Sequence, residues 1–343
     1  MSNAERLQTW AGAKVDSGFL RVMEWAWSFG NRSPEKIIPA RHVALDRYTS
    51  PALLENPMIF YPEPPAPSVT RISSKRVGDA QVERFRWRSG YRTYDRSYQS
   101  EFDGYQANQM AYAETRFIGA DRPTVICLHP WMVGSFFLSR QTFQALYEQP
   151  INIALITLPF HGPRNSRLGG PLFPGRDLQR TNEGFGQLVW DVRSLLAHLI
   201  ERTRAPIGVV GMSLGGYGAA LLAGIEPRLR FSVPIIPFID LPELMWWHGK
   251  QRTERLKQET EGLDLAEMQR VYSIHNPLRY QPLQPKERRM VVAGRADRIC
   301  HPDHAVRLWK HWDQPELYYW AGSHVLQFGR DKALTALMRI IES

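Results

Sequence analysis

Short apolar runs alternate with longer amphipathic stretches from residue 123 onwards. Apolar runs of strand length are typical of strands covered on both faces, as in a parallel sheet, and the stretches between them predict helices. In chain order, the pattern predicts a strand at 123–129, a strand at 153–158, a helix at 182–202, a strand at 207–212, a helix at 216–223, strands at 231–236, 290–293 and 316–320, and a helix at 332–341. This alternation indicates an α/β fold with a mostly parallel central sheet flanked by helices.

The first eighty residues follow a different pattern. Residues 18–29 are densely apolar, and their polar residues Arg21, Glu24 and Ser28 share one narrow stripe of a helix. This predicts a helix buried against the rest of the protein or against a partner, with an interfacial membrane helix as the alternative. Prolines recur through 31–68 and predict an extended arm with at most short helices. We therefore expect residues 1–80 to form an N-terminal helix and arm outside a main domain at 81–343.

Two strands and a tyrosine-rich connection are expected at the start of the main domain. Val82, Phe85 and Trp87 alternate with charged residues, which predicts a strand at an exposed edge of the sheet. A second strand is expected at 108–117. The connection between them is interpreted as a surface loop. Its tyrosines are Tyr91, Tyr94, Tyr98 and Tyr105.

The alternation of strands and helices breaks after residue 237. Residues 241–280 have mostly helical character and include Met245, Trp246 and Trp247 in succession, more apolar surface than one helix face can bury. An insertion at the carboxyl end of a strand overhangs any site formed there. We therefore expect residues 241–280 to form a helical cap.

Composition is that of a globular protein, with 43% hydrophobic and 22% charged residues. The formal net charge of +9 would suit nucleic acid or an anionic membrane, but no nucleic-acid-binding motif accompanies it. Cys127 and Cys300 are too few for a disulfide framework, which favours a reducing compartment. Neither a secretory signal pattern nor an apolar stretch of roughly 20 residues is found. The sequence predicts a soluble, cytoplasmic protein that binds no nucleic acid, with peripheral membrane contact as a less favoured alternative.

A serine between two glycines ends the strand predicted at 207–212. Gly211, Ser213 and Gly215 form the pattern G-x-S-x-G. Small residues are needed on both sides, because the serine adopts a strained backbone conformation and a Cβ at either glycine would collide with the neighbouring strand or helix. Such a turn projects the serine hydroxyl away from the sheet, where it can serve as a nucleophile.

An aspartate and a histidine follow two later strands. Asp297 and His324 each come just past the end of a predicted strand. Because functional groups gather beyond the carboxyl ends of the strands in open α/β sheets, we expect both to meet Ser213 at one edge. A histidine can take the proton of a serine hydroxyl, and a carboxylate holds that histidine in the right tautomer. Asp240, after the strand at 231–236, is the alternative acid.

Together these motifs resemble the α/β-hydrolase fold superfamily of serine esterases and related enzymes, from about residue 81 to the end. Five segments carry the resemblance in the expected order: LHPWMVGS at 128–135, LPFHGPR at 158–164, GMSLGG at 211–216, AGRAD at 293–297 and GSH at 322–324. The resemblance implies an α/β-hydrolase fold with a cap insert, a catalytic triad of Ser213, Asp297 and His324, and neither a metal nor an organic cofactor.

The expected oxyanion hole departs from the commoner pattern. Many relatives have His-Gly where this chain has His129 and Pro130, and proline has no N–H to donate. The backbone N–H groups of Leu214 and Trp131 are therefore expected to stabilise the oxyanion, with Met132 as the alternative to Trp131. His129 is interpreted as a residue that shapes this loop.

Residues expected to contact the substrate come from three places. They are Met212 beside the nucleophile, Arg164 and Arg167 in the loop after the second core strand, and Trp246 and Trp247 in the insert. Tryptophans offer an apolar wall and guanidinium groups suit carboxylate or phosphate, so we expect a substrate with an apolar acyl part and an anionic part. The alternative is that the arginines are only solvated and the tryptophans only pack.

The expected function is hydrolysis of an ester, thioester or amide of a small-molecule acyl substrate through an acyl-enzyme. Acyl transfer to an alcohol or thiol is an alternative, because the same triad supports it. A non-catalytic homologue that acts as a binding protein is a second alternative, which an intact triad disfavours.

Overall fold

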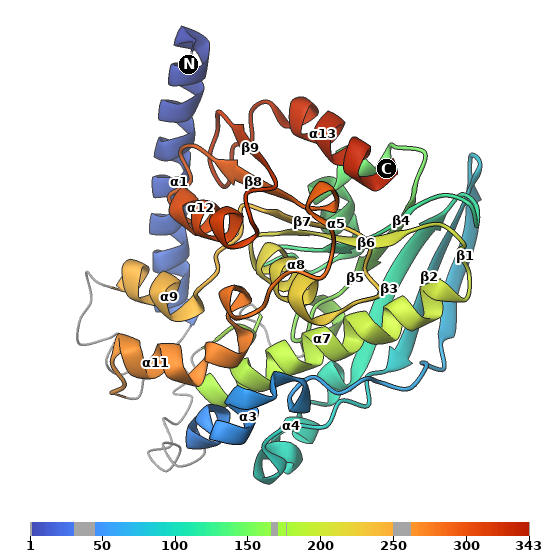
Figure 1. Cartoon of the computed structure of the whole chain (residues 1–343), viewed down its shortest axis with the longest axis vertical. Coiled ribbons are helices and arrows are strands. Elements are labelled where there is room, and N and C mark those ends of the chain that lie inside the picture. Colours follow the sequence, from blue (N-terminus) through green and yellow to red (C-terminus); the bar gives the residue numbers. More distant parts are fainter. Residues whose placement is uncertain (1, 31–44, 166–170, 176, 250–261, 343) are drawn as a thin grey trace.

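One sheet organises the part of the chain that the structure describes. The computed structural model describes residues 2–30, 45–165, 171–175, 177–249 and 262–342. These residues form a nine-stranded sheet in the order β1-β2-β3-β5-β4-β6-β7-β8-β9 (Figure 1). The strands are β1 (Thr70–Val77), β2 (Ala80–Arg88), β3 (Met110–Phe117), β4 (Thr124–Leu128), β5 (Asn152–Ile156), β6 (Ile207–Met212), β7 (Ser232–Ile235), β8 (Met290–Gly294) and β9 (Glu316–Trp320). The strands β1, β2, β3 and β5 pair antiparallel with one another in this order. The strands β5, β4, β6, β7, β8 and β9 pair in parallel, which confirms the predicted α/β fold.

Helices cover both faces of this sheet. The main covering helices are α6 (Gln144–Tyr147), α7 (Leu178–Ile200), α8 (Leu214–Ile225), α12 (Pro302–His311) and α13 (Arg330–Glu342). Neighbouring residues of β4 divide between two cores: Ile126 packs with α7 and α8, and Cys127 packs with α6 and α13. A third apolar cluster joins α12 to α8 and β8. Burial on both faces explains why the core strands have nearly continuous apolar sequences.

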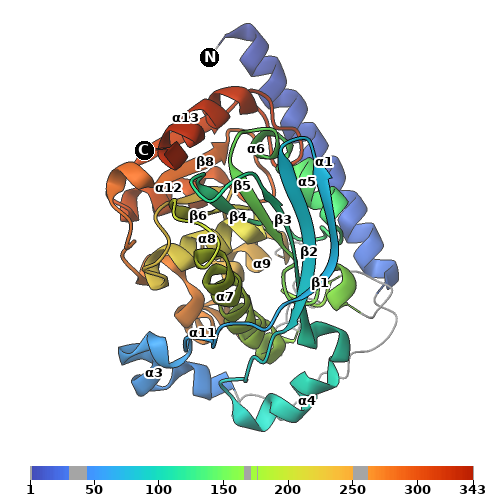
Figure 2. The same cartoon turned by 90° about the vertical axis from the view of Figure 1, so that its right-hand side faces the viewer.

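The antiparallel end of the sheet differs from the prediction. The strand expected at an exposed edge is β2, and it lies inside the sheet because β1 pairs with it. All eight residues of β1 are exposed, and β1 forms the edge that faces the viewer in Figure 2. A strand that buries neither face has no alternation of apolar and polar residues, so the hydrophobic pattern did not reveal it.

The tyrosine-rich connection is also not the expected surface loop. Tyr91 and Tyr98 are buried, and Tyr91 donates to the buried carboxylate of Glu183 on α7 at 2.7 Å. Glu183 accepts three further hydrogen bonds, from Tyr48 Oη and from the backbone N–H groups of Tyr94 and Asp95. The connection is therefore packed onto the start of α7.

The arm contains only short helices in its described part, 45–68, as predicted. These are η2 (Asp46–Thr49), α3 (Pro51–Glu55) and η3 (Pro57–Ile59). Leu53 and Phe60 are buried in the same core as α7, so this part of the arm packs directly on the sheet domain. Residues 31–44 lie outside the described residues.

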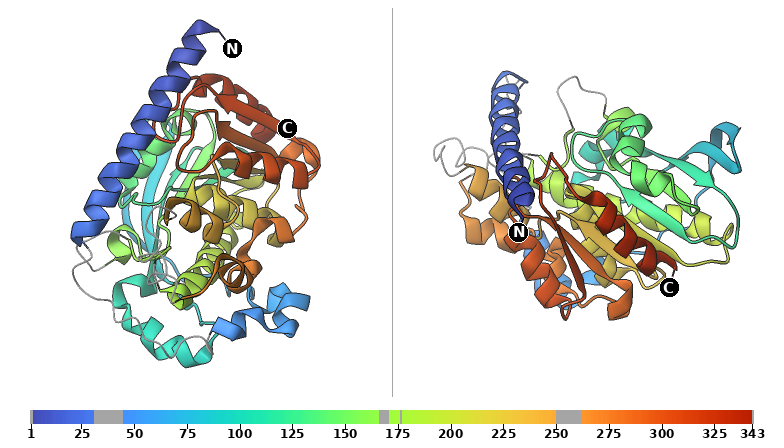
Figure 3. Two further views of the ribbon diagram at one scale, coloured as in Figure 1. Left: turned by 90° about the vertical axis from the view of Figure 1, so that its left-hand side faces the viewer. Right: turned by 90° about the horizontal axis from the view of Figure 1, so that it is seen from above.

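The N-terminal helix is longer than the apolar stretch that predicted it. α1 (Asn3–Gly30) lies along the side of the molecule where α9 and the segments after β8 and β9 are found (Figure 3). Asp16 on this helix is fully buried. The side chains of Glu24 and Ser28, which define the predicted polar stripe with Arg21, lie outside the described residues.

The insert after β7 is helical where it is described. It contains α9 (Leu241–Gly249), α11 (Leu265–Val271) and the short turns η7 (Ser273–His275) and η8 (Pro277–Arg279). A hydrogen bond between Asp240, which precedes α9, and Gln269 of α11 ties the two helices together at 2.9 Å. Within the described ranges, we find no helix with the length and apolar character needed to span a membrane.

Candidate active site

Ser213 occupies the turn between β6 and α8. Its backbone is in an unusual left-handed region, with φ 54° and ψ −113°, and its N–H donates to the carbonyl of Ile235 at 2.9 Å. A Cβ added at Gly211 would meet the Gly215 carbonyl, and one added at Gly215 would meet the Leu128 carbonyl. Backbone atoms cannot move aside as side chains can, so this turn requires glycine at both positions. Only 7% of the Ser213 surface is exposed.

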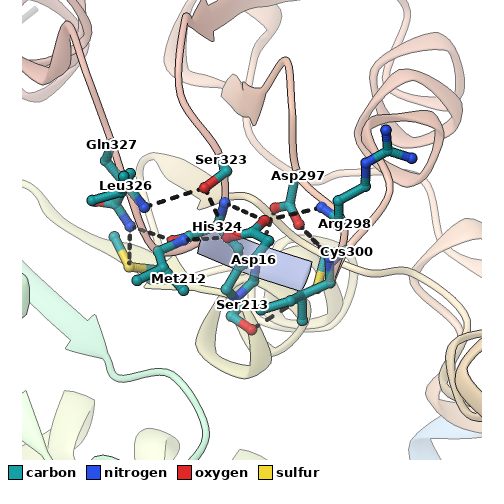
Figure 4. Close-up of polar contacts among 12 residues, drawn as sticks. Asp16, Met212, Ser213, Asp297, Arg298, Cys300, Ser323, His324, Leu326 and Gln327 are labelled. Atoms are coloured by element: carbon teal, nitrogen blue, oxygen red, sulfur yellow. Dashed lines mark hydrogen bonds and ion pairs between the residues drawn. The ribbon is translucent and has the colours of Figure 1, made fainter. Parts of the chain in front are cut away.

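His324 and Asp297 meet directly beyond the ends of β9 and β8. Nδ1 of His324 lies 2.8 Å from Oδ2 of Asp297, to which it donates (Figure 4). The other oxygen, Oδ1, accepts from the backbone N–H groups of Ile299 at 2.8 Å and Cys300 at 2.7 Å. The carboxylate is buried and accepts three hydrogen bonds, which fix its orientation toward the imidazole.

The alternative acid, Asp240, binds groups of the insert instead of the histidine. Its Oδ1 accepts from the N–H of Glu243 at 2.9 Å in the first turn of α9, and its Oδ2 accepts from Gln269 Nε2. Both oxygens therefore stabilise the insert. The structure pairs His324 with Asp297 and not with Asp240.

Asp297 controls the protonation of His324. Burial is the largest single influence and lowers the pKa of the imidazole, because an apolar environment disfavours the charged form, but the adjacent Asp297 and Cys300 together raise the pKa by more than burial lowers it. The net result is a pKa well above the ordinary 6.5.

Cys300 lies beside the serine. Its Sγ is 3.9 Å from Ser213 Oγ, and the same thiol interacts with the His324 imidazole. Among the hydrogen bonds of the described residues, there is none between Ser213 and His324. Sequence reasoning assigned Cys300 no role, although its position three residues after Asp297 placed it at the same edge of the sheet.

The groups expected to form the oxyanion hole are at the same edge. Leu214 is the first residue of α8, and its N–H has no acceptor among the described residues. Trp131 and Met132 follow β4, which is the neighbour of β6, and Met132 has a positive φ of 70°. This loop therefore starts next to the serine turn, with Pro130 unable to donate.

His129 and His161 are structural. His129 Nδ1 donates to the Pro130 carbonyl at 2.8 Å, and its Nε2 accepts from the Leu158 N–H at 3.0 Å. Burial lowers its pKa to about 4, so it is neutral near pH 7. The ring of His161 packs edge-on against it, with centroids 5.0 Å apart. The pair joins the loops after β4 and β5.

Two of the residues expected at the substrate, Arg164 and Met212, are buried in the protein interior. Arg164 is buried, forms an ion pair with Asp191 of α7 at 2.8 Å and donates to the carbonyls of Thr157 and Asn108. Its guanidinium is held inside the protein, which corrects the prediction of a substrate-facing arginine. Met212 is buried in the core shared with α13, where its Sδ lies 3.5 Å from Gln327 Nε2. Arg167 lies outside the described residues.

Trp247 of the insert lies near the loop that follows Asp297. Trp246 is half-buried, whereas Trp247 is 64% exposed with its ring 6.2 Å from that of His301. His248 Nε2 lies 2.9 Å from the Ile299 carbonyl. The insert therefore contacts the segment whose N–H groups hold Asp297. No cluster of three metal-ligating side chains was found when the described part of the chain was searched.

A strained serine between β6 and α8 of a mostly parallel sheet defines a protein of the α/β-hydrolase fold. The chain belongs to the same family as two proteins of Mycobacterium tuberculosis, "Uncharacterized protein Rv2627c" and "Uncharacterized protein MT2702". It is 33% identical to each over 299 residues, which cover 84% of this chain and 71% of theirs. No protein-family model matches the chain.

Solved structures agree on the fold. An acetyl xylan esterase from Paenibacillus sp. R4 superposes with a TM-score of 0.58 and 16% identity, covering 91% of this chain and 97% of its own. Acetyl xylan esterase 1 from Thermoanaerobacterium sp. JW/SL YS485 gives a TM-score of 0.53 and 15% identity, with coverages of 87% and 94%. At such low sequence identity, the structural similarity shows a shared fold, and the reaction must be argued from the residues of the site.

Proposed function

We propose that the protein is a serine hydrolase that cleaves an ester, thioester or amide through an acyl-enzyme on Ser213. The observation that carries the proposal is the buried pair of Asp297 and His324 at the sheet edge where the strained serine lies. A histidine held in one tautomer by a carboxylate is the partner that a weakly nucleophilic serine requires. The two acetyl xylan esterases support ester cleavage as the reaction class, without indicating this protein's substrate.

In the proposed reaction, His324 Nε2 takes the hydroxyl proton as Ser213 Oγ attacks the acyl carbon. The imidazolium, stabilised by Asp297, then gives that proton to the leaving group as its bond to the acyl carbon breaks. Water repeats the sequence: His324 takes a proton from the water, the acyl carbon is attacked, and the proton returns to Ser213 as the acid leaves.

The oxyanion formed in each half-reaction needs donors that are already in place. Leu214 N–H at the start of α8 is one, and the N–H of Trp131 or Met132 is the other. Each such donor contributes about 3 to 4 kcal/mol to the transition state in the best-studied hydrolases.

The direct test is labelling with a fluorophosphonate, followed by peptide mass spectrometry. We expect one adduct on Ser213, absent from Ser213→Ala, and hydrolysis of p-nitrophenyl esters that falls about a millionfold in the same variant. Ser232→Ala is a matched control, because this buried hydroxyl only donates to the Ala219 carbonyl at 3.0 Å. Absence of labelling in the wild type would favour a binding protein. Product esters formed with an added alcohol would favour acyl transfer.

A further inference from the structure

One carboxylate of the N-terminal helix binds both loops that present the acid and the base. The Asp16 side chain accepts four hydrogen bonds, from residues that surround it in Figure 4. Its Oδ1 accepts from Ser323 Oγ at 2.7 Å and from Val325 N–H at 3.0 Å. Its Oδ2 accepts from the N–H groups of Arg298 and His324, each at 3.0 Å. These four donors fill the lone-pair sites that a carboxylate offers.

These donors are the neighbours of the catalytic groups. Arg298 is next to Asp297 in sequence, and the His324 N–H belongs to the base itself. Asp16 therefore links the two loops through the backbone, in parallel with the side-chain hydrogen bond between Asp297 and His324. Rotation of either loop would break contacts to the same buried carboxylate.

Neighbouring turns of α1 fit the same loop. Thr9 donates to the Ala321 carbonyl at 2.7 Å. Gly12 lies so close to Ser323 that an added Cβ would be 2.9 Å from Ser323 Cβ. Thr9, Gly12 and Asp16 are spaced three and four residues apart, which places them on one face of the helix. The face of α1 that carries Asp16 is thus shaped to the histidine loop.

We propose that Asp16 is a positioning residue that sets the orientation of His324 relative to Asp297 and Ser213, and that α1 is therefore part of the active site. This inference rests on the proposed hydrolase function for its kinetic consequences. The proposal also predicts the orientation of His324, which can be measured without any substrate.

Asp16→Asn is the informative variant. An amide has nearly the same shape, but its NH₂ group faces two of the four donors and cannot accept from them. The loops should then relax by fractions of an ångström, and misplacement on the 1 Å scale can cost about a hundredfold in rate. We expect kcat to fall about thirty- to a hundredfold with little change in KM, and the acid limb of the pH profile to move toward 6.5 as His324 loosens from Asp297.

Glu183→Gln is a matched control. Glu183 is also a buried carboxylate with four hydrogen bonds, but its partners belong to the arm and the tyrosine connection. Both variants should lower the midpoint of chemical unfolding, whereas kcat and the acid limb should change only in Asp16→Asn. Equal kinetic effects, or an Asp16→Asn enzyme that is less stable but kinetically normal, would reduce Asp16 to a structural residue and overturn the proposal.

A second variant and an NMR measurement also test the role of Asp16. Ser323→Ala removes one of the four donors and should give a smaller change of the same kind if Asp16→Asn does not fold.

The downfield proton NMR signal of His324 Nδ1–H, identified by its loss in His324→Gln, should shift or broaden in these variants and stay unchanged in Glu183→Gln. If the wild type shows no labelling at Ser213, the proposed function fails while this signal still decides the positioning role. An unchanged signal would overturn that role.

Discussion

Cys300 Sγ lies 3.9 Å from Ser213 Oγ, and the thiol is a shared neighbour of the serine and of His324. Burial raises the pKa of this thiol, so it is protonated at neutral pH and is a weak hydrogen-bond partner. His324 must therefore exchange the thiol for the serine hydroxyl before it can accept a proton. Catalytic contacts often tighten in this way only when substrate binds.

The thiol itself should be dispensable. In Cys300→Ala, the imidazole loses its competing neighbour, so we expect kcat/KM within about threefold of wild type, well below the effect of losing a general base. Cys300→Ser places a stronger hydrogen-bonding group beside His324 and should be slower than Cys300→Ala. Steady-state kinetics and the rate of fluorophosphonate labelling measure both. A Cys300→Ala enzyme as inactive as Ser213→Ala would show that the thiol is required for catalysis and would contradict this prediction.

The two candidate acids can be separated by amide substitutions. Asp297→Asn keeps the acceptors for the Ile299 and Cys300 N–H groups but turns an NH₂ group toward His324, which enforces the wrong tautomer. We expect a loss in kcat of about ten-thousandfold. Asp240→Asn should leave kcat nearly unchanged, because asparagine also caps a helix well. A large loss in Asp240→Asn alone would reverse the assignment.

The pH dependence follows from the raised pKa of His324. Its imidazole must be neutral to take the serine proton, so activity is present above this pKa and is lost as the pH falls through it. The acid limb of the pH profile of kcat/KM should therefore have its midpoint above pH 6.5. His129, with a pKa of about 4, stays neutral across this range and does not contribute. A limb at or below 6.5 would show that Asp297 does not act on the free enzyme as described.

The glycines of α8 should differ sharply in tolerance. A Cβ at Gly215 meets the Leu128 carbonyl, whereas one at Gly218 meets only Leu128 and Leu188 side-chain carbons at 3.2 to 3.5 Å. We expect Gly215→Ala to reduce the free energy of unfolding by about 3 kcal/mol or more, at the upper end for overpacking. Gly218→Ala should be nearly neutral, because the helix propensity gained, about 1 kcal/mol, offsets the tight contact. Denaturant titration of both variants measures the difference, and equal losses would contradict the backbone collision.

The features that could be predicted from the sequence are those determined by residues close together in the chain. The runs around Val209 and Val292 predicted buried strands, and the glycines around Ser213 predicted the strained turn. Asp297 and His324 could be placed at one edge because parallel strands deliver their carboxyl ends to the same side.

The missed features depend on partners that are distant in sequence. Arg164 was predicted to contact the substrate, and the sequence could not reveal its ion pair because the partner, Asp191, lies on α7. β1 buries neither face and so had no periodic signal. Asp16 precedes the helix predicted at 18–29, and no local pattern distinguishes it from a solvated acid.

The bond between Asp16 and the His324 N–H spans 308 residues, which gives the protein an order of events during its own synthesis. At about 5 to 20 residues per second, roughly 15 to 60 s separate the translation of these two residues. Ser213 and the strand and helix on either side of its turn are translated before His324, the base of the proposed mechanism. If the protein is the proposed hydrolase, a nascent chain carries the nucleophile before the base that activates it, and hydrolysis begins only when the loop after the last strand has packed against the first helix of the chain.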